Sequence, residues 1–455
     1  MTDDAGAIHQ ASLDLLENPG VRVEHDEIVS RLKARGAKTS GGRVVRFPPE
    51  MVMEHLALCP REVVLADRRG GKAVLSAESE PVFWACPGMY WYHKGERRLF
   101  TSRDMAALTR VLDQLEHVQA VFGMALDDIP PPVRDVVGLH IMARNTTKHI
   151  RALCFSAQGA RILAEMKAVV GDTPWFSVGF TAHGPLRWTN LALEVFKQTA
   201  GYGIPATVNG EPMAGVSGPV TLAGAAAVGN AEILAGLVIN QVLEPGRPCI
   251  HNLGLAHVFD MRTAIAVTGG PENALLAQIA GMMGRFYGLP SASWVSTESM
   301  CPDAQAALEK MFGFHSHMQS GVSCVWGVSQ LESELTVSPE QAVIDNEMIA
   351  YARRYRRGYA VGEETLALEV IRETGIAGSF LDREHTLDHF RSELFMPGLL
   401  FRKRWSDWEE KGHRRLEERA ADEAAVLMRN DVPNGLSDEQ IEALSRFAAR
   451  AVAAA

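Results

Sequence analysis

The chain has 455 residues, 47% of them hydrophobic and 22% charged, so it is long enough for two or three domains or for one barrel with extensions. Its formal net charge of −10 argues against a nucleic-acid partner, because such a partner would need a basic face. The six cysteines contain no CxxC pair, and the N-terminal sequence MTDDAGAIHQ lacks the basic start and apolar core of a signal peptide. We therefore expect a reduced, cytoplasmic protein.

Residues 1–78 are predicted to form an N-terminal α+β extension. Helical spacing of apolar residues occurs at 8–16 and 28–32, and short β-branched runs follow at 44–45 and 63–65. None of these segments has catalytic spacing, so we expect a layer that packs on the rest of the protein.

Residues 79–335 are predicted to form a (β/α)8 TIM barrel, an α/β fold. Short β-branched or aromatic runs alternate there with helical stretches; the runs lie at 82–85, 118–124, 150–156, 175–180, 205–209, 248–252, 292–295 and 322–328. About eight alternations in about 250 residues are typical of this barrel. A doubly wound open sheet is the alternative, but no GxGxxG loop opens a helix where a nucleotide would bind.

The most informative part of this region runs from 209 to 252, where a strand, a Gly-rich loop, a long apolar helix and a second strand are predicted. The helix is expected at about 220–243, long enough to span a membrane. Polar residues inside it favour a helix buried in a soluble protein, and we expect no membrane; they are Asn230, Glu232, Asn240 and Gln241.

Residues 336–455 are predicted to be helical and to pack on the barrel or at a subunit interface. The stretch 394–408 carries several aromatic and aliphatic residues, more than one barrel face needs for its cover. We therefore expect a homo-oligomer, with packing on the chain's own barrel alone as the alternative.

The loops after the predicted strands should hold the active site, because barrels of this type place it at the C-terminal ends of their strands. These loops share aromatic residues, Met and nearby carboxylates. Aromatic faces attract a quaternary ammonium, so a pocket for such a cation is one interpretation; rings that only fill the upper barrel layer are the other. Three converging metal ligands are not evident, and no metal site is predicted. A GxSxG nucleophile elbow is also missing.

Four segments resemble the trimethylamine methyltransferase superfamily: PMAGVSGPVTLAGAAAVGNAEILAGLVINQVLEPGRPCIHN (212–252), PENALLAQIAGMMGRFYGLPS (271–291), LESELTVSPEQAVIDNEM (331–348) and GSFLDREHTLDHFRSELFMPGLLFR (378–402). The resemblance implies a barrel that moves a methyl group from a methylated amine to the cobalt(I) of a corrinoid on a separate protein. Founding members carry pyrrolysine. This chain has only standard residues and resembles the branch whose best understood activity is glycine betaine demethylation.

The resemblance leads to a set of expected site residues. The predicted catalytic residues are His317, Glu211 and Glu298, and the predicted substrate contacts are Tyr90, Tyr92, Phe180, Asn252, His315, Trp326 and Glu332. Tyr90, Tyr92, His317 and Trp326 would form a wall around the quaternary nitrogen, with His315 as the alternative to His317. A carboxylate pressed against the nitrogen would stabilise the bound donor more than the transition state, so carboxylates are expected further away.

We expect no tightly bound cofactor, because the Asp-x-His-x-x-Gly segment of a cobalamin site is missing; the corrinoid, cobalamin, would be presented by the cognate corrinoid protein. A small quaternary amine is the expected substrate. The alternatives are another TIM-barrel enzyme, a lyase or hydrolase with acid–base carboxylates, and a non-catalytic betaine-binding protein.

Overall fold

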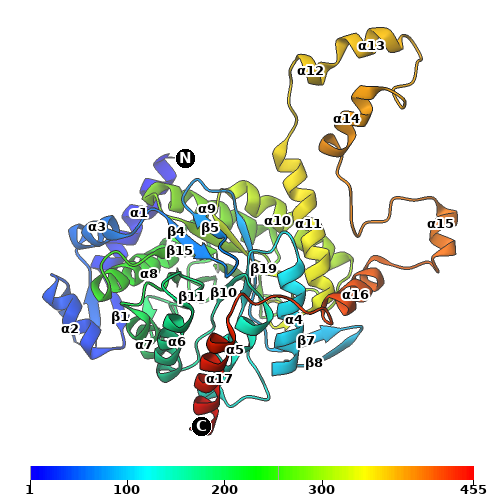
Figure 1. Cartoon of the computed structure of the whole chain (residues 1–455). Helices are drawn as coiled ribbons and strands as arrows, with labels where there is room; N and C mark the ends of the chain where they lie inside the picture. The colour runs from blue at the N-terminus through cyan, green and yellow to red at the C-terminus, as the bar shows by residue number, and fades with distance from the viewer. Residues whose placement is uncertain (1, 42, 255, 455) are drawn as a thin grey trace.

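Eight parallel strands close into a barrel in the computed structural model, which describes residues 2–41, 43–254 and 256–454 (Figure 1). The strands are β6 (Val82–Ala85), β9 (Ala120–Phe122), β10 (His149–Arg151), β11 (Phe176–Thr181), β13 (Ala206–Asn209), β15 (Cys249–Gly254), β18 (Ser291–Trp294) and β19 (Cys324–Val328). Their order around the barrel follows the chain, and β19 pairs with β6 to close it. The predicted TIM barrel is confirmed, and the open sheet is excluded.

A helix follows each barrel strand and covers its outer face. These helices are α4 (Ser102–Gln114), α5 (Arg134–Asn145), α6 (Ala157–Val170), α7 (Asn190–Thr199), α8 (Leu222–Leu243), α9 (Pro271–Tyr287), α10 (Ala304–Ser320) and α11 (Pro339–Arg357). Their starts are fixed by local chemistry. Thr101 and Asp104 form a capping box at α4, and the Ser156 hydroxyl accepts a hydrogen bond from the Gly159 N–H at α6.

Helix α8 lies at the centre of the packing and begins two residues after the predicted start. It is long and apolar enough to cross a membrane, yet 83% of its most apolar stretch is buried inside the protein. Asn230 on this helix donates to the hydroxyls of Ser12 and Tyr287, each at 2.9 Å. A Cβ at Gly236 would lie 2.5 Å from Trp188, so glycine is needed for this close approach. These features are those of a core helix of a folded protein.

The N-terminal segment forms the layer that covers α8. Its elements are α1 (Thr2–Glu17), β1 (Val21–Val23), α2 (Asp26–Ala34), β2 (Lys38–Ser40), β3 (Val44–Arg46), α3 (Pro49–Leu58), β4 (Val63–Ala66) and β5 (Lys72–Leu75). Helices α1 and α3 pack on α8, and β1 pairs with β12 (Arg187–Trp188) in the loop after β11. This cover explains why α8 is apolar on nearly every face.

Two small sheets stand at the C-terminal end of the barrel strands. One contains β20 (Gln330–Leu331), β21 (Thr336–Val337), β7 (Tyr90–His93) and β8 (Glu96–Leu99); the other contains β14 (Met213–Ala214), β16 (His257–Asp260) and β17 (Ile265–Val267). They border the barrel mouth, which is the end where a TIM barrel carries its active site.

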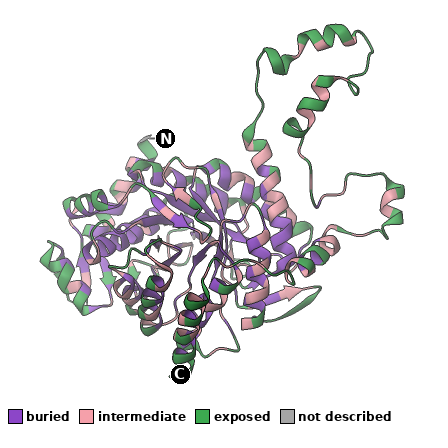
Figure 2. Ribbon diagram, viewed as in Figure 1, coloured by how far each residue is buried: buried purple, intermediate pink, exposed green. Residues whose placement is uncertain are grey.

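The C-terminal region divides into two parts. Helices α16 (Leu416–Leu427) and α17 (Asp438–Ala453) pack on the barrel. Residues 359–411, here called the arm, project away from it (Figure 1). The arm contains α12 (Glu363–Leu366), α13 (Leu368–Thr374), α14 (Glu384–Glu393) and α15 (Trp405–Glu410), and it is mostly exposed (Figure 2). Several apolar side chains of the arm therefore lack cover from their own barrel, among them Ile371, Ile376 and Leu381.

Candidate active site at the barrel mouth

A cavity of about 180 Å³ opens at the C-terminal ends of the barrel strands; we call it the barrel-mouth cavity. Its lining includes the charged residues Arg151, Glu211 and Glu334, the aromatic residues Phe122, Phe180 and Trp326, and the polar residues Thr181 and Asn209. They come from strand ends and from the loops that follow, so distant parts of the chain meet here. The place is the one that the barrel fold predicts for an active site.

Arg151, the last residue of β10, is the positive group of this cavity and is only 2% exposed. Its guanidinium carbon lies 5.1 Å from the ring centre of Phe122 and 5.9 Å from that of Trp326. One guanidinium nitrogen, Nη1, donates to the Ala152 carbonyl, whereas Nε has no partner among the described residues. A Cβ at Gly179 would lie 2.5 Å from Nη2, so glycine makes room for this side chain.

The charge of Arg151 has no carboxylate partner within the described part of the chain; the ionisable groups near it are the thiols of Cys86 and Cys154, whose pKa values are raised by burial so that they stay neutral. Burial lowers the pKa of Arg151 to about 10, so the guanidinium stays protonated at neutral pH. An unpaired buried charge is costly, and the site therefore has room for an anion that the chain itself does not supply.

Arg247 shows what a satisfied buried arginine looks like in the same molecule. It is completely buried, and its guanidinium donates to two backbone carbonyls and to the side chains of Thr199 and Asn240 at 2.8–3.2 Å. Arg247 therefore ties α7 and α8 to the strand that follows. Among the described residues Arg151 makes one such bond, so most of its hydrogen-bonding capacity is free for a ligand.

Three carboxyl groups, here called the carboxylate cluster, lie close together: Glu211 and Glu334 line the cavity, and Glu232 of α8 adjoins Glu211. Burial raises the pKa of Glu211 to about 8, and the charges of Glu334 and Glu232 add to the rise. Burial also raises the pKa of Glu334 and of Glu232 to about 7. The cluster is therefore only partly ionised at neutral pH, and a cation that enters would favour its ionised form.

A strained turn carries Glu334 over the mouth. Residues Glu332, Ser333 and Glu334 have φ values of 54°, 46° and 77°, a left-handed conformation that non-glycine residues rarely adopt. Backbone N–H groups of Glu332 and Ser333 donate to the carbonyls of Ser299 (2.8 Å) and Thr297 (2.9 Å). Strain of this kind persists only where surrounding contacts hold it, and it clusters at functional sites.

Glu298 fixes the position of this turn through hydrogen bonds. Its carboxylate accepts hydrogen bonds from the Thr268 N–H (2.6 Å), the Gly269 N–H (3.0 Å) and the Ser333 hydroxyl (3.3 Å). It thus joins the loop after β17 to the turn that carries Glu334. Glu298 positions the site and does not line the barrel-mouth cavity.

Tyr90 and Glu332 support the other side of the turn. The Arg97 side chain donates two hydrogen bonds to the Glu332 carboxylate, at 2.7 and 2.8 Å, and its guanidinium carbon lies 3.5 Å from the centre of the Tyr90 ring. Tyr90 belongs to β7 of the small sheet, and Glu332 lies in the turn between β20 and β21. Both contact Arg97, and neither is among the residues that line the cavity.

A polar row crosses three neighbouring strand ends. Asn252 donates to the Asn209 side-chain oxygen at 3.0 Å, and Asn209 donates to the Thr181 hydroxyl at 3.2 Å. The side-chain oxygen of Asn252 accepts from the Gly254 N–H. Thr181 and Asn209 reach the cavity, whereas Asn252 stands behind them with both of its polar atoms engaged.

The two candidate histidines lie on α10, outside the barrel wall. The His317 Nδ1 bonds the Ser293 hydroxyl at 2.8 Å, and burial lowers the pKa of His317 to about 3. His315 packs edge-on against Tyr355 of α11. Trp294 of the same strand pairs in register with Trp326, which lines the cavity, so the adjacent Ser293 points outward to the helices. Neither histidine lines the barrel-mouth cavity.

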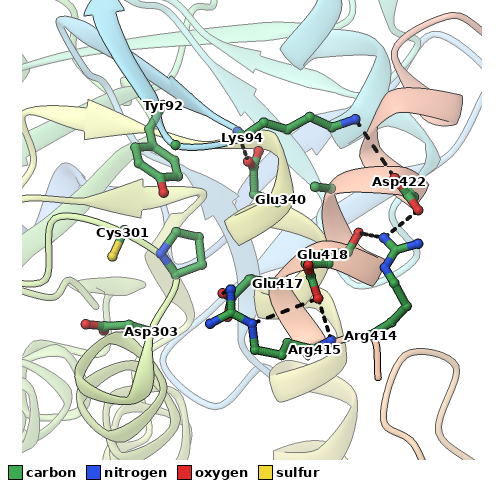
Figure 3. A pocket seen from close by; sticks show the side chains of 13 residues that line it. Tyr92, Lys94, Cys301, Asp303, Glu340, Arg414, Arg415, Glu417, Glu418 and Asp422 are labelled. Carbon is green, nitrogen blue, oxygen red and sulfur yellow. Dashed lines mark hydrogen bonds and ion pairs between the residues drawn. The ribbon is translucent and has the colours of Figure 1, made fainter. Parts of the chain in front are cut away.

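A second cavity, of about 630 Å³, lies between the loop after β18, the β7–β8 hairpin and α16; we call it the α16 cavity (Figure 3). The predicted residue Tyr92 lines this one. Its arginines are paired with carboxylates: Arg414 bonds Asp422 at 2.6 Å, and Arg415 lies 3.0 Å from Glu417. Among its described lining residues, neither arginine is therefore left without a counter-charge.

Of the predicted site residues, the structure brings Glu211, Phe180 and Trp326 into one cavity. Its other charged members, Arg151 and Glu334, are not among the site residues predicted from the sequence. An arginine inside the β-branched run at 150–156 was the available signal for Arg151. In the described part of the chain, no group of three His, Cys, Asp or Glu side chains is arranged to hold a metal ion.

The model of the family described as trimethylamine methyltransferase (MTTB) matches residues 1–455 of this chain. Trimethylamine methyltransferase MttB of Desulfitobacterium hafniense (strain DSM 10664 / DCB-2) is 31% identical, over 95% of this chain and 90% of that protein. Glycine betaine methyltransferase of Desulfitobacterium hafniense (strain Y51) is 28% identical, over 98% of this chain and 96% of that protein. The crystal structure of the Methanosarcina barkeri monomethylamine methyltransferase aligns with a TM-score of 0.55 and 14% identity, over 93% of this chain and 86% of that one, and this likeness concerns the fold alone.

Proposed function

The chain belongs to the trimethylamine methyltransferase family, and on that premise we propose that it moves a methyl group from a quaternary amine of the glycine betaine kind to the cobalt(I) of a corrinoid on a separate protein. The observation that carries the proposal is the charge pattern of the barrel-mouth cavity. Partly ionised carboxyls and the Phe180 ring stand at its mouth. A quaternary nitrogen has no N–H donor, so charge and ring faces are what can bind it.

The size of the cavity supports a small donor. Its volume of about 180 Å³ lies below the roughly 300 Å³ at which pockets for drug-sized ligands begin. A corrinoid cannot enter such a space and must meet the donor at the mouth. A cobalt(I) acceptor presented there would supply the nucleophile and take over the methyl carbon; the carbon–nitrogen bond of the donor would break, its electron pair would stay on nitrogen, and the amine would leave neutral.

The contribution of this chain to the step is alignment and charge control. Walls that hold one N-methyl group toward the mouth supply orientation, which lowers the barrier by several kcal/mol in well-aligned reactions, on the order of 7–11 in the best cases. Carboxylates beside the nitrogen would oppose the loss of its positive charge. The raised pKa values of Glu211 and Glu334 soften this opposition, because the cluster can take up a proton once the charge has gone.

A set of exposed apolar side chains borders the barrel mouth, and we propose it as the docking face for the corrinoid protein. The members of this apolar rim are Met89, Val216, Val220, Met261, Ile265, Met300 and Leu335, all 40–69% exposed. They lie in the segments that connect a barrel strand to the helix after it, and exposed apolar side chains there favour an interaction surface. Substituting Met261 and Met300 with Glu should abolish transfer to the corrinoid protein and leave transfer to free cob(I)alamin intact.

The arm suggests a second copy of the chain as a further partner. It starts at α11 and ends at α16, both of which pack on the same barrel, and it exposes Leu368, Ile371, Leu381 and Leu387 between them. Two copies could exchange arms symmetrically, so that each covers the apolar side chains of the other. Light scattering should give a mass above that of one chain at micromolar concentration; a monomer would contradict this part of the proposal.

The proposed function is tested by a methyl-transfer assay under reducing conditions with free cob(I)alamin. The donors are glycine betaine, carnitine, choline, proline betaine and trimethylamine, and mass spectrometry measures the demethylated amine. We expect product from at least one quaternary amine and none without protein. Product from trimethylamine alone would contradict the proposal. Binding of a betaine with no product, with free cob(I)alamin or with a cognate corrinoid protein, would favour a binding protein.

A further inference from the structure

We propose that Arg151 binds a carboxylate of the methyl donor, so that the substrate class is a zwitterion with a quaternary nitrogen at one end and a carboxylate at the other. The inference rests on the proposed function, since it concerns the same cavity. It goes beyond it by adding a second subsite, which distinguishes betaines from quaternary amines that lack an acid group.

The donors for an anion are already in place at Arg151. The guanidinium has one intramolecular hydrogen bond, its Nε has no partner among the described residues, and its carbon lies 5.1 Å from the ring centre of Phe122 and 5.9 Å from that of Trp326. A planar fork that is fixed by ring contacts suits a carboxylate, which it can bind through two parallel bonds. Nη2 lies close to the backbone at Gly179, and any larger residue there would displace the guanidinium from this position.

The carboxylate cluster does not neutralise this arginine. No described carboxylate acts on the charge of Arg151, and the pKa of Glu211 is raised, whereas an adjacent arginine would lower it. One cavity thus holds a buried cation and, apart from it, ionisable carboxyls. A molecule with both charges complements both ends at once, and a simple cation leaves the arginine unpaired.

The position of each group along the chain gives the orientation of the donor. Arg151 belongs to a barrel strand, while Glu211 comes two residues after β13 and Glu334 lies in the turn after β20. The positive group is therefore deeper and the carboxyls are nearer the mouth. A betaine would enter with its carboxylate first and leave its N-methyl groups at the mouth, where an acceptor on another protein can reach them. The reverse orientation would bring the ammonium against the guanidinium.

Isothermal titration calorimetry at pH 8 tests this assignment with two ligands, glycine betaine and tetramethylammonium, which share the quaternary nitrogen and differ in the carboxylate. The wild-type protein should bind glycine betaine on the order of 10- to 100-fold more tightly, the range expected for a hydrogen bond to a charged group. Arg151→Met should remove this preference and leave tetramethylammonium binding nearly unchanged. Glu334→Gln is the matched control at the other end and should weaken both ligands by similar factors.

Equal affinity of the wild-type protein for both ligands would overturn the inference, and so would an equal loss of both in Arg151→Met. If that variant fails to fold, as judged by its melting curve, the wild-type preference decides alone. Methyl transfer from choline as readily as from glycine betaine would overturn the inference and leave the proposed function standing. Arg151-dependent betaine binding without methyl transfer from any amine would overturn the proposed function and leave the carboxylate subsite.

Discussion

The two cavities at the C-terminal end of the barrel differ in volume and in charge balance. Volume alone would favour the α16 cavity as the binding site, whereas charge balance favours the barrel-mouth cavity. The α16 cavity, about 630 Å³, is lined by arginines and carboxylates that pair with one another (Figure 3). The barrel-mouth cavity, about 180 Å³, contains an arginine without a counter-ion and carboxyls with raised pKa values. An uncompensated buried charge marks a binding site better than volume does.

Solvent explains the contrast. Arg415 and Glu417 of the α16 cavity are 69% and 38% exposed, so water screens their pairing, which contributes about 0–1 kcal/mol. Arg151 is 2% exposed, so solvent screens its charge much less. Changes in the barrel-mouth cavity should therefore alter binding strongly, and matched changes in the α16 cavity should not.

The largest expected effect comes from charge reversal. Glu334→Lys places a second positive charge beside the quaternary nitrogen, and we expect glycine betaine binding to fall by more than about 100-fold, because like charges in a buried site repel by several kcal/mol. Glu417→Lys, the matched reversal in the α16 cavity, should change the dissociation constant by less than about twofold. Calorimetry on both variants, with melting curves as the control for folding, measures the difference. Similar losses of glycine betaine affinity in the two variants would contradict the assignment of binding to the barrel-mouth cavity.

The pH dependence of binding should separate the cavities next. Because Glu211 and Glu334 have pKa values of about 8 and 7, a bound cation draws protons off them. Affinity for glycine betaine should rise about tenfold or more between pH 6 and pH 9, with proton release detectable by calorimetry in buffers of different ionisation enthalpy. A flat profile would contradict the raised pKa values. Charge reversal at Glu417 should leave the profile unchanged.

The same two groups affect the stability of the ligand-free protein. Their folded pKa values are raised above the unfolded value of about 4.5, so their contribution to the free energy of unfolding is full below about pH 4.5 and is lost as pH rises through about 7 to 8. Glu211→Gln should therefore lose less stability than the wild type between pH 6 and pH 9. Denaturant unfolding at both pH values checks the sign; a greater loss in the variant would contradict it.

Removal of the support beneath the turn should have a smaller effect on binding than on stability. Glu298→Ala leaves the N–H groups of Thr268 and Gly269 without their acceptor, at a cost of about 1–3 kcal/mol of unfolding free energy for each buried unpaired group. Methyl transfer should fall as Glu334 loses its fixed position. Glu417→Ala is the control in the α16 cavity and should change neither quantity measurably.

Substitution of one aromatic residue in each cavity should give the smallest difference in glycine betaine binding between the two cavities. Trp326→Leu removes a ring that stacks on Trp84 and contacts Arg151, and it should weaken glycine betaine by on the order of 1–2 kcal/mol, roughly tenfold. Tyr92→Leu, in the α16 cavity, should have no measurable effect. Equal losses would mean that the α16 cavity also takes part in binding.

The sequence predicts the barrel well, because the alternation of strand and helix repeats around it and each repeat is local. The rule that active sites follow strand ends also leads to Glu211, Phe180 and Trp326. Arg151 is missed because its inward direction depends on the parity of a three-residue strand, and a shift of one residue would turn it outward. Glu334 depends on a left-handed turn that no sequence pattern announces.

The histidines show a different limit. Both lie within a stretch that the sequence already predicts to be helical, and the helices of a TIM barrel stand outside its strands. Alternation, which applies to strands, therefore cannot bring either His315 or His317 to the inside. His317 instead packs between α10 and the outer face of β18, where its ring bonds the Ser293 hydroxyl.

A crystal structure of the protein soaked with glycine betaine tests the central claim most directly. We expect density in the barrel-mouth cavity, with the carboxylate within hydrogen-bond distance of the Arg151 guanidinium and the quaternary nitrogen beside Glu211 and Glu334. Density in the α16 cavity instead, or a betaine whose nitrogen points toward Arg151, would contradict it.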